Sequence, residues 1–273
     1  MDKGPKTKQL VHGPRIMGIL NVTPDSFSDG GSYSDPARAV DYALCMVQEG
    51  AHIIDIGGES SRPGAAAISV EEESKRVLPV IHELRRQSSV AISIDTTKSK
   101  VAAEAILAGA TIINDISAGL MDKEMFAVAA KAEVYICLMH MKGTPQMMQQ
   151  SPQYENVVTE VKNFLQARIE AAMAVGISFD KICIDPGIGF GKRVEDNVAL
   201  LKGLAQLKKL GCPILIGTSR KSFIGAITGA AVEERLPGSL ASMAVAIQNG
   251  ADIVRVHDVA ATRQFLSVFC PLI

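Results

Sequence analysis

The sequence lacks tryptophan, contains only eight Phe and four Tyr, and carries almost no net charge, with 28 Lys+Arg against 29 Asp+Glu. A chain without a basic field or a run of like charges is not built to bind nucleic acid or an anionic membrane, and we expect neither as a partner. So few aromatic residues also disfavour a surface that anchors another protein or a single strand. No apolar stretch approaches the ~20 residues of a membrane span.

Cysteine pairing is also missing. The five cysteines form no CxxC motif and are odd in number, and Cys137, Cys183 and Cys270 lie inside apolar runs. This usage predicts buried free thiols and a cytoplasmic protein, and it excludes a disulfide framework and a zinc site of the common type. What the chain does have is 47% hydrophobic residues, which is enough for a large core.

Three junctions repeat one pattern, Gly-Ala-x-Ile-(Ile/Val)-polar. They begin at Gly50, Gly109 and Gly250. A segment of helical period precedes each glycine, and a short β-branched run follows it, continuously apolar as in a strand buried on both faces. The glycine falls where a helix end turns left-handed. The pattern therefore predicts a repeated βα unit.

Eight runs of this kind are present. They are Arg15–Leu20, His52–Ile56, Val90–Asp95, Thr111–Ile116, Val134–Met139, Lys181–Asp185, Pro213–Thr218 and Asp252–His257. Eight strands alternating with helices predict a (β/α)8 TIM barrel, an α/β fold of one domain with residues 1–14 as an N-terminal extension. A doubly wound open sheet with eight strands is the alternative, which periodicity does not exclude.

A barrel places its active site at the carboxyl ends of the strands, and polar residues collect there in this sequence. They include Asn21, Ser61, Arg62, Asp95, Asn114, Asp185, Lys221, Ser222, Arg255 and His257. Each one has an ordinary structural explanation: Asp95 could cap the following helix, Lys221 could be a solvated charge and Arg255 an ion-pair partner. Strand ends that only cap helices, however, have no reason to bring together two acids, an amide and several cations.

These residue types suit two neighbouring ligands. Asp95, Asn114 and Asp185 offer acceptors and an amide donor to a flat heterocycle rich in N–H groups. Arg255 can lie flat on its face. Together with Arg62, Lys221 and a charged His257, Arg255 can also neutralise a phosphate or diphosphate. The residues alone therefore predict a heterocycle site beside a polyanion site.

Other motifs are weaker. The segment 187–193 (GIGFGKR) is one residue short of a Walker loop and has Arg193 where Ser or Thr should hold magnesium. No GxGxxG precedes a downstream acid, and no HxH or HExxH is present. The sequence favours neither a dinucleotide site nor a metal site made by the protein alone.

Five blocks identify a family. They are NVTPDSFSDGG (21–31), GGESSRPG (57–64), DPGIGFGK (185–192), SRKSFIG (219–225) and RVHD (255–258). With these blocks in order, each at a predicted strand end, the chain resembles dihydropteroate synthase over essentially its full length. The resemblance implies a (β/α)8 barrel that condenses 7,8-dihydropterin-6-ylmethyl diphosphate with 4-aminobenzoate, giving 7,8-dihydropteroate and pyrophosphate in folate biosynthesis.

The resemblance also implies ligands and partners. Mg2+ would be held mainly by the diphosphate together with Asn21. Sulfonamides would inhibit the condensation, and the protein would be a homodimer.

The family's roles map onto this sequence as follows. The pterin would be bound by Asp95, Asn114, Asp185 and Lys221, with Arg255 stacked on its face. The diphosphate would be bound by Asn21, Ser61, Arg62, Arg255 and His257. The 4-aminobenzoate pocket would contain Phe27, Pro63, Phe190, Lys221 and Ser222. The residues expected to act in catalysis are Asp95, Asp185, Lys221, Arg255 and His257.

One position departs from the family: Ser61 stands where Thr is frequent, so the hydroxyl is kept and a methyl is lost. Arg220 is expected to form a structural ion pair. An SN1-like path fits the residues, because carboxylates would stabilise a pterin methylene cation and cations would surround the leaving group. The sequence is also compatible with two alternatives: a methyl-tetrahydrofolate-binding methyltransferase barrel and a non-catalytic pterin-binding paralogue.

Overall fold

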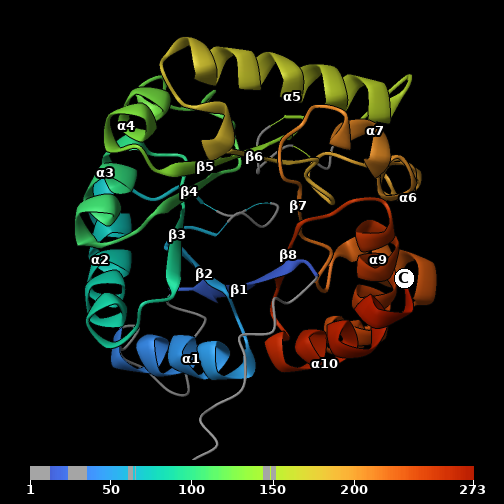
Figure 1. Ribbon diagram of the computed structural model, residues 1–273, viewed down its shortest axis with the longest axis horizontal. Helices are drawn as coiled ribbons and strands as arrows, with labels where there is room; N and C mark the ends of the chain where they lie inside the picture. Colours follow the sequence, from blue (N-terminus) through green and yellow to red (C-terminus); the bar gives the residue numbers. More distant parts are fainter. Residues whose placement is uncertain (1–12, 24–35, 61–63, 65, 144–147, 149–151) are drawn as a thin grey trace, which may run out of the picture.

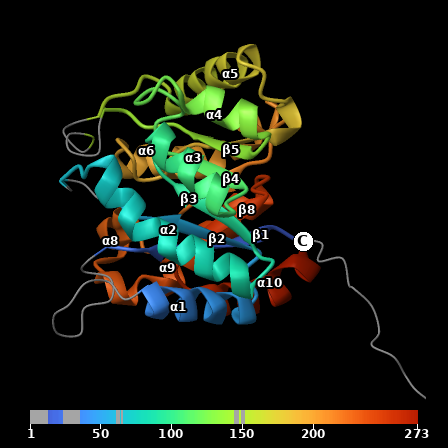
Figure 2. The same ribbon diagram turned by 90° about the vertical axis from the view of Figure 1, so that its left-hand side faces the viewer.

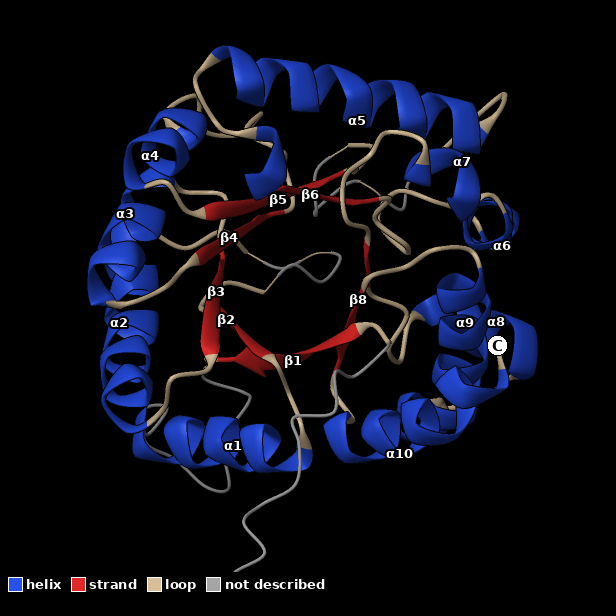
Figure 3. Ribbon diagram, in the orientation of Figure 1, coloured by secondary structure: helices blue, strands red, loops and turns tan. Residues whose placement is uncertain are grey.

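The computed structural model is a barrel of strands enclosed by a ring of helices (Figures 1 and 3). It describes residues 13–23, 36–60, 64, 66–143, 148 and 152–273. Figure 2 turns the barrel by 90°, so that the helices on its outer side face the reader.

Eight parallel strands form one sheet in the order β6-β5-β4-β3-β2-β1-β8-β7. Their bounds are β1 Arg15–Asn21, β2 Ile53–Gly57, β3 Ala91–Asp95, β4 Ile112–Asp115, β5 Tyr135–Met139, β6 Ile182–Asp185, β7 Leu215–Ile216 and β8 Ile253–Val256. A single bridge between Ile184 and Ile214 links the two ends of this order, so the barrel is nearly closed. The predicted barrel is confirmed, and the open-sheet alternative is wrong.

Helices follow the strands around the outside. They are α1 Pro36–Glu49, α2 Val70–Gln87, α3 Ser99–Ala108, α4 Met125–Ala132, α5 Val157–Ala174, α6 Val194–Lys202, α7 Leu204–Lys208, α8 Ser222–Thr228, α9 Leu236–Gln248 and α10 Val259–Phe269. Short 3-10 turns lie at η1 Phe179–Lys181, η2 Val232–Glu234 and η3 Cys270–Leu272. The helices bury apolar faces against the outward side chains of the strands in one large core.

The repeated glycine junctions are left-handed, as predicted. Gly50, Gly109 and Gly250 have φ angles of 110°, 116° and 103°, just after α1, α3 and α9. A side chain at these angles would strain the backbone, so glycine turns each helix back to the next strand.

Two layers of side chains fill the barrel. A basal layer takes one apolar side chain from each strand: Met17, Ile53, Ala91, Ile112, Cys137, Cys183, Leu215 and Ile253. Residues two positions further along a strand point to the same side of the sheet. They form a second layer, here called the site layer: Ile19, Asp55, Ser93, Asn114, Met139, Asp185, Gly217 and Arg255. The polar side chains therefore rest on an apolar floor at the carboxyl end of the barrel.

The strand predictions match to within one residue at each end, except for the seventh strand, which is shorter by two residues at each end. Only Leu215 and Ile216 form β7, where the sequence predicted Pro213–Thr218. Pro213 has no N–H for a ladder, and the N–H of Ile214 donates to the Asp252 carboxylate at 2.8 Å. The side chain of Asp252, just before β8, therefore takes the place of a ladder bond beside β7.

The five cysteines are free, as predicted, but only Cys137 and Cys212 are buried. Cys183 and Cys270 are half-buried, and Cys45 is exposed on α1. No described helix is both long enough and apolar enough to cross a membrane. Residues 1–12 of the predicted N-terminal extension lie outside the described residues, and the single-domain organisation stays a prediction.

Candidate active site

Four polar side chains from four strands meet inside the barrel. The Arg255 guanidinium donates from Nε to Asp55 and from Nη2 to Asp95, both at 2.6 Å. The amide of Asn114 donates to the same Asp55 oxygen at 3.0 Å. Asp55 is fully buried, and its other oxygen has no partner within the described protein. Asp55 therefore orients both Arg255 and Asn114.

The charges of this cluster shift one another's pKa values. Burial raises the pKa of Asp95 to about 7, although the neighbouring Arg255 lowers it in part. Burial alone would lower the pKa of Arg255, but Asp55 and Asp95 outweigh that effect and raise it. Arg255 therefore stays charged, and Asp95 titrates near neutral pH.

A third carboxylate, that of Asp185, lies at the end of β6. Asp185 is 6% exposed and accepts the backbone N–H of Gly187 at 2.6 Å. Burial raises its pKa, against the effect of the Gly187 bond and of Lys221. Such a carboxylate lacks a strong internal partner, so a ligand with N–H groups would satisfy it.

Lys221 and Phe190 lie together beside Asp185. The Nζ of Lys221 is 4.1 Å from the centre of the Phe190 ring. Burial and then Arg255 lower the pKa of Lys221 to about 8, while Asp185 and Asp95 oppose that change. Ser222 begins α8 next to Lys221 and is exposed. The structure thus brings together three of the five residues predicted for the 4-aminobenzoate pocket.

His257 is held by Ser219. The Nδ1 atom lies 3.0 Å from the Ser219 hydroxyl, which also accepts the His257 backbone N–H at 3.2 Å. A hydroxyl that accepts that N–H can donate its own hydrogen to Nδ1, which leaves the ring proton on Nε2. Burial and then Arg255 lower the pKa of His257 to about 4, so the ring is neutral at pH 7 when no anion is bound beside it. The neutral ring still offers one N–H donor.

Arg220 forms the predicted ion pair. Its guanidinium contacts Asp258 through Nε at 3.0 Å and Nη2 at 2.5 Å. Arg220 also has a φ of 56°, which is rare for a residue with a side chain. The Ser239 hydroxyl accepts its N–H at 2.9 Å, and Arg235 donates to its carbonyl at 3.2 Å. These contacts hold the turn that presents Lys221.

Asn21 ends β1, half-buried, and pairs in register with Gly57, which in turn pairs with Asp95. It is therefore at the same rim as the cluster. Phe27, Ser61, Arg62 and Pro63 lie outside the described residues, and their predicted roles stay predictions.

Asp55 and Ser219 are not among the site residues predicted from the sequence. The signal for Asp55 was present, because it occupies the polar position of the repeated junction, as Asn114 and Arg255 do in the other two copies. The three residues are joined through the Asp55 carboxylate. Nothing in the local sequence indicates that Ser219 contacts a histidine 38 residues away.

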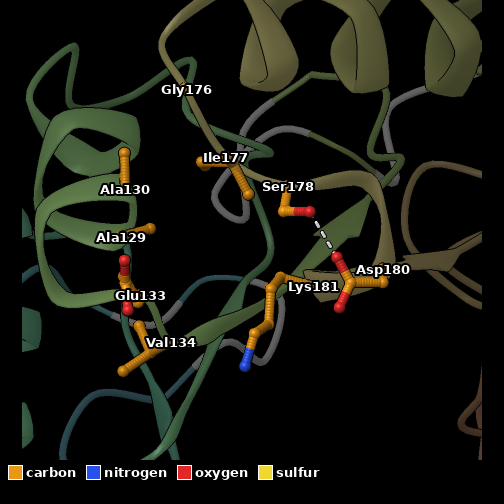
Figure 4. Close-up of a pocket in the computed structure, with 9 residues that line it drawn as sticks. All are labelled: Ala129, Ala130, Glu133, Val134, Gly176, Ile177, Ser178, Asp180 and Lys181. Carbon is orange, nitrogen blue, oxygen red and sulfur yellow. Dashed lines mark hydrogen bonds between the residues drawn. The ribbon is translucent and has the colours of Figure 1, made fainter.

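A pocket of about 280 Å³ lies at the opposite end of the barrel, between α4 and the turn before β6 (Figure 4). Its polar side chains include Lys181 and a hydrogen-bonded pair, Ser178 and Asp180. Strand amino ends carry no active site in known barrels, and the two acids that line this pocket, Glu133 and Asp180, are exposed. Among the described residues, no group of three or more His, Cys, Asp or Glu side chains is placed to hold a metal ion.

Comparison with known proteins agrees with this geometry. Residues 17–257 match the family model described as pterin binding enzyme. The chain is 49% identical over 254 residues to the dihydropteroate synthase of Synechocystis sp., covering 93% of this chain and 88% of the relative. The chain belongs to the dihydropteroate synthase family.

Solved structures of dihydropteroate synthases superpose closely. One is the Xanthomonas albilineans enzyme with 4-aminobenzoic acid, at 48% identity and a TM-score of 0.90, covering 96% of this chain and 94% of that one. Another is the Yersinia pestis enzyme in a sulfonamide drug complex, at 42% identity and a TM-score of 0.91, covering 100% and 98%. The predicted enzyme class, a transferase, is confirmed, and the methyltransferase and non-catalytic alternatives gain no support.

Proposed function

We propose that the site layer and its rim bind dihydropterin diphosphate and 4-aminobenzoate and join them into dihydropteroate with release of pyrophosphate. The single observation that carries this proposal is the arrangement of Asp95, Asn114 and Asp185 at the carboxyl ends of their strands, above an apolar floor, with Arg255 hydrogen-bonded to Asp95. Amino and ring N–H groups of a pterin would satisfy the carboxylates, and Lys221 would donate to a ring acceptor.

The leaving group would lie at the rim. Arg255, the Nε2 donor of His257 and Arg62 would contact the diphosphate, together with Ser61 and Asn21. Loss of pyrophosphate leaves a methylene cation conjugated with the pterin, so a dissociative path suits a site with two buried carboxylates. The arylamine is neutral at pH 7 and attacks without a strong general base.

We also propose that Mg2+ accompanies the diphosphate. Magnesium is commonly bound through substrate phosphates and one or two protein oxygens, so a single amide oxygen at the rim, that of Asn21, fits this donor set. When bound, the ion would neutralise charge that develops on the leaving group. Arg255 and His257 would orient the same phosphates.

The second substrate would bind between Phe190, Lys221 and Ser222, with Phe27 and Pro63 completing the pocket. Its carboxylate would accept a hydrogen bond from Ser222 and form an ion pair with Lys221. Sulfonamides, which share the aryl amine shape, would compete there. A homodimer and a cytoplasmic location are further proposals; the five free cysteines suit a reducing compartment.

The test is release of pyrophosphate from dihydropterin diphosphate and Mg2+, measured with and without 4-aminobenzoate. We expect release to depend on 4-aminobenzoate and to be blocked by a sulfonamide, with dihydropteroate as the organic product. Binding of the pterin without any release would favour a non-catalytic paralogue. Sedimentation of the same preparation tests the dimer.

A further inference from the structure

The loop that follows β6 contains a lysine buried away from solvent, to which the proposed reaction gives no role. Lys192 is 3% exposed, and its Nζ makes contacts with two loops. It donates to the carbonyl of Phe190 at 2.9 Å and to the carbonyl of His140 at 3.3 Å, and it lies 3.0 Å from His140 Nδ1. A buried lysine is costly unless its hydrogen bonds are complete, so this position needs a reason.

The two loops are packed too closely for ordinary side chains. A Cβ at Gly187 would lie 2.0 Å from the carbonyl oxygen of His140, and one at Gly191 would lie 2.3 Å from that of Lys142. The hydroxyl of Tyr154 donates to the Gly191 carbonyl at 2.7 Å, which is a further hydrogen bond to this loop. The backbone of 187–191 is thus set by its contact with 140–142, and Lys192 joins the two from inside.

Lys192 and His140 can satisfy each other in either protonation state. An ammonium donates to both carbonyls and to Nδ1 when the ring proton is on Nε2, whereas a neutral amine donates to the carbonyls and accepts from Nδ1–H. Burial lowers the pKa of Lys192 to about 7, with Asp185 and Asp196 opposing and Lys221 adding to the effect. Burial and then Lys192 lower the pKa of His140 to about 3. The hydrogen bonds between Lys192 and His140 therefore persist when Lys192 gains or loses its proton.

The contacts of Lys192 reach Phe190, which is part of the site. Its carbonyl is held by Lys192, while its ring lies under the Lys221 ammonium at 4.1 Å. We propose that Lys192 is a positioning residue that fixes Phe190, and with it the 4-aminobenzoate half of the site, without touching substrate. This inference rests on the proposed placement of 4-aminobenzoate beside Phe190.

The experiment compares Lys192→Met with Arg193→Met, each as the full-length enzyme. Methionine keeps an unbranched apolar chain but removes all three contacts of Nζ. Arg193 is the neighbouring residue, 44% exposed, and its side chain contacts Asp196 and Glu195, away from the loop. We expect Lys192→Met to raise the KM for 4-aminobenzoate about tenfold, because displacements of about 1 Å in a positioned site have effects of this order or larger. The Kd for pterin diphosphate should stay within twofold, and Arg193→Met should change neither constant.

A double-mutant cycle with Phe190→Leu shows whether the effect passes through Phe190. In the Phe190→Leu background, Lys192→Met should add little to the KM for 4-aminobenzoate. If Phe190→Leu alone leaves that KM unchanged, 4-aminobenzoate does not bind beside Phe190. That result contradicts the proposed function, and it is distinguished from a failure of the Lys192 inference because it does not involve the Lys192 variant.

Two results would overturn the inference: an unchanged KM for 4-aminobenzoate in folded Lys192→Met, or an equal loss of affinity for both substrates. If Lys192→Met does not fold, Lys192→Gln replaces it, because glutamine retains a two-hydrogen donor in a neutral side chain. The same selective rise in KM, smaller than tenfold, is then expected, and its absence contradicts the inference.

Discussion

The carboxylate of Asp55 accepts a hydrogen bond from Arg255 Nε at 2.6 Å, although the two residues are 200 positions apart. Asn114 donates to the same oxygen. Asp55 therefore acts as the common support for a cation and an amide that come from other strands, and the pterin site depends on a residue that need not contact the pterin.

Replacing Asp55 by Asn should lower kcat/KM for pterin diphosphate by about a hundredfold. The amide offers a neutral acceptor in place of a carboxylate oxygen that two donors share, so the contact that fixes the plane of Arg255 is weakened, and loss of alignment in a positioned site has effects of this size. Steady-state kinetics on folded protein measures the effect.

The matched control for Asp55→Asn is Ser93→Ala. Ser93 lies in the same layer on the next strand, and its buried hydroxyl has no partner within the described protein. Its removal should change kcat/KM less than threefold. An equal fall in kcat/KM for the two variants would show that activity is sensitive to any change in this layer. It would contradict the supporting role assigned to Asp55.

The pH dependence of kcat/KM should be bell-shaped, with its maximum between about 7 and 8. Asp95 must be ionised to accept pterin N–H groups, and its burial-raised pKa of about 7 makes activity rise as the pH passes through that value. Lys221 must be protonated, and its lowered pKa of about 8 makes activity fall above it. Rates between pH 5.5 and 9.5 test this, and a profile flat from pH 6 to 9 would contradict both assignments.

Ser222→Ala should raise the KM for 4-aminobenzoate severalfold while the Kd for pterin diphosphate stays nearly constant. Ser222 is exposed at the start of α8 and directly follows Lys221. An exposed hydroxyl that donates to the substrate carboxylate, in competition with water, contributes about 1 kcal/mol, which corresponds to this change. Kinetics with one substrate saturating separates the two constants. A loss of pterin binding would show that Ser222 belongs to the other half-site.

Much of this arrangement could be predicted from the sequence. The eight strands and the three left-handed glycine junctions follow from local patterns, namely short β-branched runs and glycine after a helical segment. The polar residues at strand ends could be assigned because a barrel brings all carboxyl ends to one face.

The remaining features depend on contacts between distant segments. The neutral state of His257 follows from its burial and its neighbouring cations, which no spacing reveals. The tie between Lys192 and His140 joins two loops 52 positions apart, and the short β7 results from a side chain of Asp252 that competes for a strand N–H. Such effects belong to packing, and only a three-dimensional structure shows them.

The central claim is that the site layer recognises the edge of a pterin through buried carboxylates. Its most direct test is a calorimetric titration with dihydropterin diphosphate and Mg2+ of wild-type protein, Asp185→Asn and Asp180→Asn. Asp180 is a matched control, because it lies at the opposite end of the barrel, where its carboxylate bonds to Ser178. We predict that Asp185→Asn abolishes binding and that Asp180→Asn binds as the wild type does; undiminished affinity in Asp185→Asn would contradict the account.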